Sequence, residues 1–223
     1  MKKLHNVVDI PKQYESMSVM TFIKGFKFNE LYWYNNLSLF LGYSSIWGFI
    51  FNGNDLLCSI FHISIKESGN VNSMLFIFYI IFAIMTGFIL KINRKLYTIS
   101  SIFSIFIGLA SFLALIYFPE DTSVFALVIP VAGLGAYYGI YNVCEIALIN
   151  LLIDETNLAK SFGMTWSIIA LSQSVPPMFL GEIKDHTKGY FWVIIFLLIL
   201  AVSQIVPLGI LGIKLKNKMK TFY

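Results

Sequence analysis

The stretch GFILKINRKLY, residues 87–97, separates two long apolar runs and decides how the chain is organised. It places Lys91, Arg94 and Lys95 in one short turn, without an acidic residue to offset them. A cationic turn between apolar runs is typical of membrane proteins, where basic residues stay in the cytoplasm and meet anionic headgroups. We therefore expect the chain to cross a bilayer on both sides of this turn.

The composition of the whole chain favours the same interpretation. Hydrophobic residues make up 57% of the 223 residues and charged residues 13%, against about 45–50% and 25% in soluble domains. A soluble core of this size could not enclose so much apolar surface. The two cysteines, Cys58 and Cys144, lie in or beside apolar runs, so we expect small buried side chains rather than a disulfide framework.

Six apolar segments are long enough to cross the hydrocarbon core, which takes about 20 helical residues. The predicted spans are residues 32–51, 74–90, 96–118, 124–153, 162–180 and 190–213. They predict an all-α membrane protein with three parts: a cytoplasmic segment at 1–30, a six-helix bundle at 31–213 and a basic cytoplasmic tail at 214–223.

The distribution of basic residues predicts the orientation. Six crossings place 13 of the 16 Lys and Arg residues on one side of the membrane and three, Lys66, Lys184 and Lys188, on the other. Because the side richer in Lys and Arg is cytoplasmic, both termini are predicted to lie in the cytoplasm.

A polar stripe in the fourth predicted span is the first candidate site. Ionisable groups within spans are costly, so they mark functional candidates. Tyr138, Tyr141, Asn142 and Glu145 stand at i, i+3, i+4 and i+7 and are expected to share one helix face. They would line a hydrated cavity in which the Glu145 carboxylate holds an ammonium or exchanges a proton. A purely structural stripe that bonds neighbouring helices is the alternative, and the sequence leaves both open.

Two further polar positions are cavity candidates. Asn52, Asn54 and Asp55 would unwind the first span and expose backbone groups to a substrate, or they would simply end that span. Gln173 offers both a donor and an acceptor to a ligand, or serves as a contact between helices. Pro176-Pro177 follows it and is expected to disturb its helix.

Two turns of the chain share a pattern. GFILK at 87–91 and GEIKD at 181–185 both read Gly-x-Ile-x-charged at predicted helix ends. With six spans they would face opposite sides of the membrane. The pattern predicts that spans one to three and four to six form a 3+3 inverted repeat, an architecture common in secondary transporters.

The first of these turns resembles the signature loop of the major facilitator superfamily, which reads Gly-x-x-x-Asp-x-x-Gly-Arg-Lys. Gly87 and Lys95 fit this pattern. Lys91 stands in place of the acidic residue and Arg94 in place of the second glycine, so the turn has no carboxylate for a gating contact. The resemblance implies a gating role for six residues of the two turns: Gly87, Lys91, Arg94, Lys95, Gly181 and Asp185.

The resemblance extends over roughly residues 30–213. Residues 133–168 are similar to the family's tenth and eleventh helices, and residues 181–196 to the junction before the twelfth. Within the superfamily, the chain is most similar to the lysosomal dipeptide-transporter branch, although Glu145-Ile146-Ala147 replaces its Leu-Trp-Pro. The matching positions are Gly163, Gly181, Asp185, Gly189 and Tyr190.

The resemblance implies that the chain is the carboxyl-terminal six-helix half of a transporter in a lysosomal or other internal membrane. It would move a small organic solute, such as a small peptide, by alternating access, with a second six-helix half or a second copy as partner. A non-transporting membrane subunit or a transporter remnant is the first alternative. An integral-membrane enzyme is the second, although the sequence contains no nucleophile elbow, phosphate loop or zinc motif. No catalytic residue, metal or cofactor is therefore expected.

Overall fold

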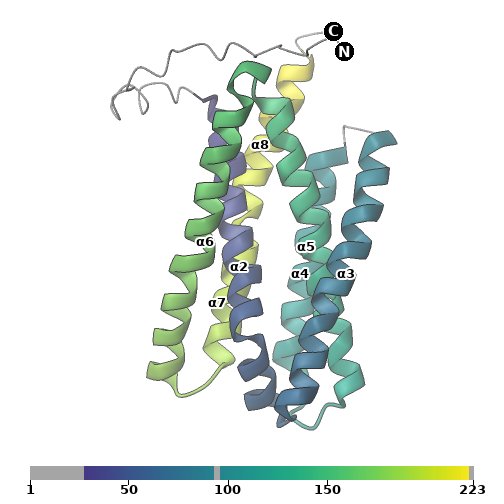
Figure 1. Cartoon of the computed structure of the whole chain (residues 1–223), viewed down its shortest axis with the longest axis vertical. Coiled ribbons are helices and arrows are strands. Elements are labelled where there is room, and N and C mark those ends of the chain that lie inside the picture. The colour runs from purple at the N-terminus through teal and green to yellow at the C-terminus, as the bar shows by residue number, and fades with distance from the viewer. Residues whose placement is uncertain (1–27, 93–95, 221–223) are drawn as a thin grey trace, which may run out of the picture.

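The computed structural model describes residues 28–92 and 96–220, and every long element in this part of the chain is an α-helix (Figure 1). A single short 3₁₀ turn, Glu155–Asn157, lies between α5 and α6. The basic residues Arg94 and Lys95 lie outside the described residues. The helices are α2 (Glu30–Phe61), α3 (Ile65–Ile92), α4 (Tyr97–Tyr117), α5 (Val124–Leu152), α6 (Leu158–Thr187), α7 (Phe191–Ser203) and α8 (Ile205–Lys220).

Four segments are long and apolar enough to cross a membrane: Ile65–Lys91, Tyr97–Tyr117, Val124–Leu152 and Phe191–Lys216. The last of these combines α7 and α8, which follow one another with Gln204 between them. This confirms an all-helical protein with several membrane-compatible helices. The two remaining helices, α2 and α6, have 32 and 30 residues but carry more polar side chains.

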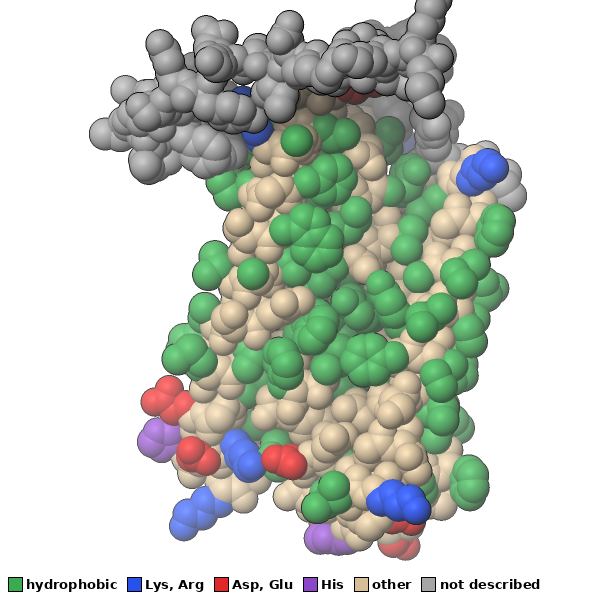
Figure 2. Space-filling model, in the orientation of Figure 1, with side chains coloured by type: hydrophobic (Ala, Val, Ile, Leu, Met, Phe, Trp, Pro, Cys, Tyr) green, Lys and Arg blue, Asp and Glu red, His purple; other side chains and the backbone are tan. Residues whose placement is uncertain are grey.

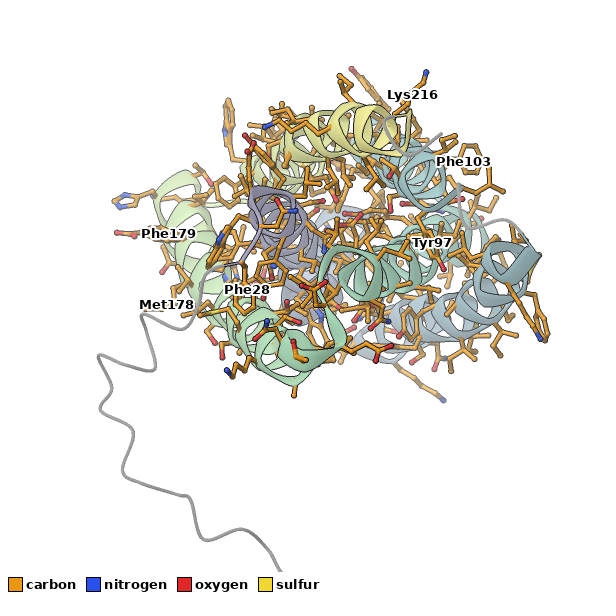
Figure 3. The ribbon with its side chains drawn as sticks, turned by 90° about the horizontal axis from the view of Figure 1, so that it is seen from above. Phe28, Tyr97, Phe103, Met178, Phe179 and Lys216 are labelled. Atoms are coloured by element: carbon orange, nitrogen blue, oxygen red, sulfur yellow. The ribbon has the colours of Figure 1, made fainter. Side chains whose placement is uncertain are left out.

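Each of the two central helices packs mainly against helices from the other half of the chain. Seen from above, α2 and α5 lie in the middle of the bundle, with α6 on one side and α3 on the other (Figure 3). The central helix α5 packs mainly against α3 and α4, which precede it in the sequence. The other central helix, α2, packs mainly against α6, α7 and α8, from the end of the chain.

Two glycines of α5 explain its close contact with α3. A Cβ atom at Gly139 would lie 2.5 Å from the backbone oxygen of Tyr79 and 2.9 Å from the nitrogen of Ala83. A Cβ atom at Gly135 would likewise collide with the backbone oxygen of Leu75. Small residues that let helix backbones approach are typical of membrane helix pairs. The Gly135-x-x-x-Gly139 spacing therefore sets the distance between α5 and α3.

The start of α2 and the end of α8 lie at the same end of the molecule (Figure 1). An ion pair joins Lys214 of α8 to Glu30, the first residue of α2. We call this the first end; α3 and α5 also end there. At the second end His62, which follows α2, is 3.7 Å from Glu120, which follows α4.

Charged side chains gather near the ends, and the middle of the visible face is apolar or uncharged (Figure 2). The outer surface carries many large exposed apolar side chains on α3, α4, α6, α7 and α8. Phe103, Met178 and Phe179 point outward and are 61%, 75% and 53% exposed (Figure 3). An apolar belt of this kind fits a lipid environment rather than water.

The structure corrects several predicted boundaries. The break at residues 52–55 is wrong, because α2 continues through it to Phe61 and Asn52 donates a hydrogen bond back to the Gly48 oxygen at 3.0 Å. Helix α3 begins at Ile65 rather than residue 74, because Ser64 and Glu67 form a reciprocal cap: Ser64 N donates to the Glu67 carboxylate at 2.9 Å and Glu67 N to the Ser64 hydroxyl.

Predicted features of α3, α6 and α8 also need correction. The glycines of the two similar turns do not end helices, because α3 continues past Gly87 to Ile92 and α6 continues past Gly181 to Thr187. Helix α6 also runs through Pro176-Pro177. Helix α8 extends to Lys220, into the segment predicted as a tail.

Candidate functional site: the interior polar zone between α2 and α5

The four residues of the predicted polar stripe all contact α2. The Tyr138 ring packs edge-on against the Tyr43 ring, with centroids 5.7 Å apart. Asn142 is bonded to the same tyrosine. The Tyr141 hydroxyl lies 3.3 Å from the Ser38 hydroxyl, and the backbone oxygen of Glu145 accepts a hydrogen bond from Asn35 at 3.2 Å. The stripe therefore lies along the α2–α5 interface in the interior of the bundle.

Three tyrosines and one amide form a cluster at mid-depth. The Tyr43 hydroxyl donates to Asn142 Oδ1 at 2.6 Å, and Asn142 Nδ2 donates to the Tyr79 hydroxyl at 2.9 Å. The Tyr79 ring stacks on the Tyr138 ring, with centroids 4.5 Å apart. Because Tyr138 lies about 21 Å along α5 from its end at Leu152, this tyrosine–amide cluster links α2, α3 and α5 near the middle of the membrane-compatible length.

A glycine on α2 makes room for this side of α5. A Cβ atom at Gly42 would lie 2.5–2.6 Å from two ring carbons and the hydroxyl oxygen of Tyr141. Tyr141 is 1% exposed, so its ring fills the space that a larger residue at position 42 would occupy. The glycine thereby allows a bulky aromatic side chain to lie directly between two central helices.

Glu145 lies deeper in the protein than any other acidic residue that the structure describes. Its side chain is 0% exposed, and neither carboxyl oxygen has a hydrogen-bond partner among the described residues. The Ser101 side chain of α4 lies next to the carboxyl group but forms no hydrogen bond with it. The Ser101 hydroxyl also has no hydrogen-bond partner. Asn35 Oδ1 is unpartnered as well. Glu145 is about 10 Å along α5 from its end at Leu152, so this group lies toward the first end.

A second amide connects the interior to the junction of α7 and α8. Gln204, the residue between these helices, is 0% exposed and donates a hydrogen bond from Nε2 to the Tyr137 hydroxyl at 2.6 Å. Tyr137 in turn fills the space beside Gly108 of α4. The Gln204 oxygen has no partner within the described residues. The interior polar zone thus extends from α2 and α5 to α4 and the α7–α8 junction.

The other predicted cavity residues lie elsewhere. Asn52 is half-buried and Asn54 and Asp55 are exposed, about two to three turns from Tyr43 toward the second end. Gln173 is half-buried on α6 and makes no hydrogen bond within residues 28–92 and 96–220. The structure therefore brings Tyr138, Tyr141, Asn142 and Glu145 together and leaves these four residues apart.

The described residues of the two similar turns lie at opposite ends of the bundle. Lys91 is exposed at the end of α3, and Gly87 is exposed one turn before it. Gly181 is half-buried and Asp185 exposed near the second end. A histidine packed beside a buried acid would favour an enzyme. His62 lies at the surface, next to the exposed Glu120.

Several interior residues were missed by sequence reasoning. The first predicted span contains an unusual number of polar side chains, and that number was the available signal. Tyr79 carries no such signal, because a single tyrosine in an apolar run is normal in a span. The missed residues are Asn35, Ser38, Tyr43, Tyr79, Ser101, Tyr137 and Gln204.

Comparisons with known proteins leave the site to be interpreted on its own chemistry. A scan against protein-family models matched none of them to this chain, and a search of curated proteins found no match either. Within the described residues, no group of three or more His, Cys, Asp or Glu side chains could hold a metal ion.

Proposed function

We propose that this protein is a secondary transporter of the major-facilitator type, or one six-helix half of such a transporter. It moves a small organic solute, such as a small peptide, by alternating access and performs no covalent chemistry. Its six-helix bundle works with a second such bundle, supplied by a partner or a second copy, in a lysosomal or other internal membrane.

Six crossings and a 3+3 repeat are supported by the arrangement of the helices. At 1.5 Å per residue, α2 and α6 are about 48 and 45 Å long, more than the hydrocarbon thickness of about 30 Å. In the proposed repeat, α2–α4 correspond to α5–α8. The packing of α5 against α3 and α4 then corresponds to the packing of α2 against α6, α7 and α8.

The charge distribution supports the proposed orientation. Near the second end, six acidic residues outnumber Lys66, Lys184 and Lys188. Lys91, Lys160, Lys214 and Lys216 lie at the first end. Because the richer basic side stays cytoplasmic, the first end faces the cytoplasm in this proposal.

The observation that carries the proposal is the interior polar zone. A protein that only anchors itself in lipid has no need of a buried carboxyl group, and such groups in spans mark solute or ion pathways. In this chain Glu145 and the tyrosine–amide cluster lie near each other at the contact between α2 and α5, the two helices at the centre of the bundle. Alternating access requires polar contacts at that place, between elements able to rock against each other.

Flux through reconstituted protein tests this proposal. Proteoliposomes would be loaded with labelled dipeptides or other small organic solutes, and Glu145→Gln would be compared with Glu182→Gln, whose carboxylate is exposed near the second end. We expect flux that Glu145→Gln reduces at least tenfold and Glu182→Gln leaves unchanged. Absence of flux for every solute, with the protein alone or co-expressed with a second bundle, would refute transport.

One observation favours the alternative of a non-transporting membrane subunit. Asn142 uses its oxygen and one of its amide hydrogens in bonds to Tyr43 and Tyr79, which is also what a structural network between helices requires. The flux experiment separates the two functions, because a structural network predicts loss of stability in Asn142 variants and no flux in any of them.

A further inference from the structure

We infer that the group around Glu145 binds a small monovalent cation, either an inorganic ion or the ammonium group of a solute. The ligands would be the Glu145 carboxylate, the Asn35 side-chain oxygen and the Ser101 hydroxyl. The inference rests on the proposed function only for the role of this cation, as solute or coupling ion; the binding itself is a separate property.

The group around Glu145 has more hydrogen-bond acceptors than donors. The unpartnered buried atoms of this group are Glu145 Oε1 and Oε2, Asn35 Oδ1 and Ser101 Oγ. All are oxygens, and with Glu145 ionised only the serine hydroxyl can also donate. Asn35 already uses Nδ2 to bond the backbone oxygen of Glu145 at 3.2 Å. The group therefore lacks positive charge and hydrogen-bond donors. An ammonium group supplies both, and a metal cation supplies the positive charge.

The described interior offers Glu145 no positively charged partner. No Lys, Arg or His side chain belongs to the buried residues in the described part of the chain. A carboxylate buried without a partner is costly, so the ionised form of Glu145 needs a cation that comes from outside the protein. An anionic ligand would increase this cost, so the same observation excludes anions from the site.

The ligand atoms available in this group select the kind of cation. Carboxylate, amide and hydroxyl oxygens suit hard cations, whereas soft metals require sulfur or imidazole ligands. Cys144 lies next to Glu145 in the sequence, and its side chain also faces Ser101. A single thiol with one carboxylate does not form a transition-metal site. The oxygen ligands therefore favour a hard cation or an ammonium group. Because Glu145 is the one buried acid among the described residues, a single positive charge balances it, as in Na⁺ or an alkylammonium.

The position of the site suggests what binding does to the bundle. Its three side chains come from α2, α4 and α5. In the proposed repeat α2 and α5 are equivalent central helices, and a cation held between them opposes their separation. Occupancy would thus stabilise one packing of the bundle over another, which is how a bound ion shifts an equilibrium between conformations.

Thermal unfolding in neutral phosphatidylcholine nanodiscs tests the site without a transport assay. N-methylglucamine would be replaced stepwise by Na⁺, K⁺ or methylammonium at constant ionic strength, so that screening does not change. We expect at least one of these cations to raise Tm in a saturable way, by about 5 °C at a hundredfold excess over Kd. A response to Na⁺ identifies an inorganic ion, and a response to methylammonium alone identifies an ammonium group.

Three variants link the effect to the site. Glu145→Gln should abolish the rise in Tm, and Ser101→Ala should weaken the apparent Kd about tenfold. Glu120→Gln changes an exposed carboxylate and should retain the full effect. If Glu145→Gln does not fold, the Ser101→Ala titration still decides the question, since an unchanged Kd there would overturn the assignment.

Two outcomes overturn the inference. If none of the cations raises Tm of the natural protein, or if Glu145→Gln responds like the natural protein, Glu145 does not bind a cation and stays neutral in the interior. Flux without saturable stabilisation would refute this inference and leave transport intact. Stabilisation without flux of any solute would refute transport and leave the cation site intact.

Discussion

Replacing Gly139 with alanine tests whether the contact between α5 and α3 is set by the missing side chain. The added methyl group would lie 2.5 Å from the Tyr79 backbone oxygen and 2.9 Å from the Ala83 nitrogen. Ordinary contacts of this kind are about 3.5 Å, so α3 must move by roughly 1 Å. Backbone atoms cannot rotate away, so we expect overpacking to cost about 1–3 kcal/mol.

Helix propensity acts in the opposite direction and has to be separated. Alanine is better than glycine in a helix interior by about 0.5–1 kcal/mol. Gly87, on α3, provides the matched control, because a Cβ atom there meets nothing within 4 Å. Gly87→Ala should therefore be neutral or stabilising. Because both variants gain the same helix propensity, they are expected to differ by the overpacking cost alone, about 1–3 kcal/mol, with Gly139→Ala the less stable.

Equilibrium unfolding in mild detergent mixed with increasing sodium dodecyl sulfate measures this difference. Far-ultraviolet circular dichroism and tryptophan fluorescence should report the same transition for both variants. Equal stability of Gly139→Ala and Gly87→Ala would refute the close approach of the two helices. It would also remove the basis for placing Tyr79 against Tyr138.

Two further substitutions test hydrogen bonds and charges at other depths. Tyr43→Phe removes the 2.6 Å bond to Asn142 and should lower the free energy of unfolding by about 1 kcal/mol; the same change at Tyr117, which is 79% exposed, should have no effect in the same unfolding assay. Glu120→Gln removes the contact with His62, whose side chain is 73% exposed, and should change Tm by less than 2 °C between pH 5 and 8, because exposed ion pairs contribute little. A larger change would mean that the second-end loops hold each other more firmly than their exposure indicates.

The sequence was most informative where a pattern depends on local chemistry. The apolar runs predicted helices at 97–117 and 124–152 to within a residue at each end, since Pro119 and Ser123 mark the turn between them. Elsewhere helices extend beyond their apolar part: α6 begins at Leu158 and ends at Thr187, because polar residues continue a helix outside the hydrocarbon without changing its backbone. Apolar runs predict the greasy length of a helix rather than its full length.

The break predicted at Asn52–Asp55 illustrates the opposite error. Asparagine and glycine have low helix propensity, but tertiary contacts outweigh that preference here. Gly53 is buried and lies close to Asn72 of α3. A Cβ atom added to Gly53 would lie 3.2 Å from the side-chain oxygen of Asn72. Helix α2 continues because its neighbour packs closely at this point, which the sequence of α2 alone does not reveal.

The part of the candidate site that lies on α5 was largely visible in the sequence. The spacing of Tyr138, Tyr141, Asn142 and Glu145 on one helix sufficed to place them along one interface. Their partners Tyr43, Tyr79 and Ser101 come from three other helices, and only the packing of those helices brings them together. Local periodicity carries the first kind of information, and tertiary contacts carry the second.

Labelling from the two sides of the membrane tests the proposal that the bundle crosses it six times and returns to the side on which it began. Single cysteines at five turns and ends, in a variant without the two native cysteines, would be labelled with a membrane-impermeant maleimide in sealed vesicles of known orientation. The positions are His62, Lys91, Asp121, Lys188 and Lys216. We expect cysteines at Lys91 and Lys216 to react from the cytoplasmic side alone and those at the other three positions to react from the opposite side alone. Reaction of Lys91 and Lys216 from opposite sides, or of His62 from the same side as Lys91, would contradict it.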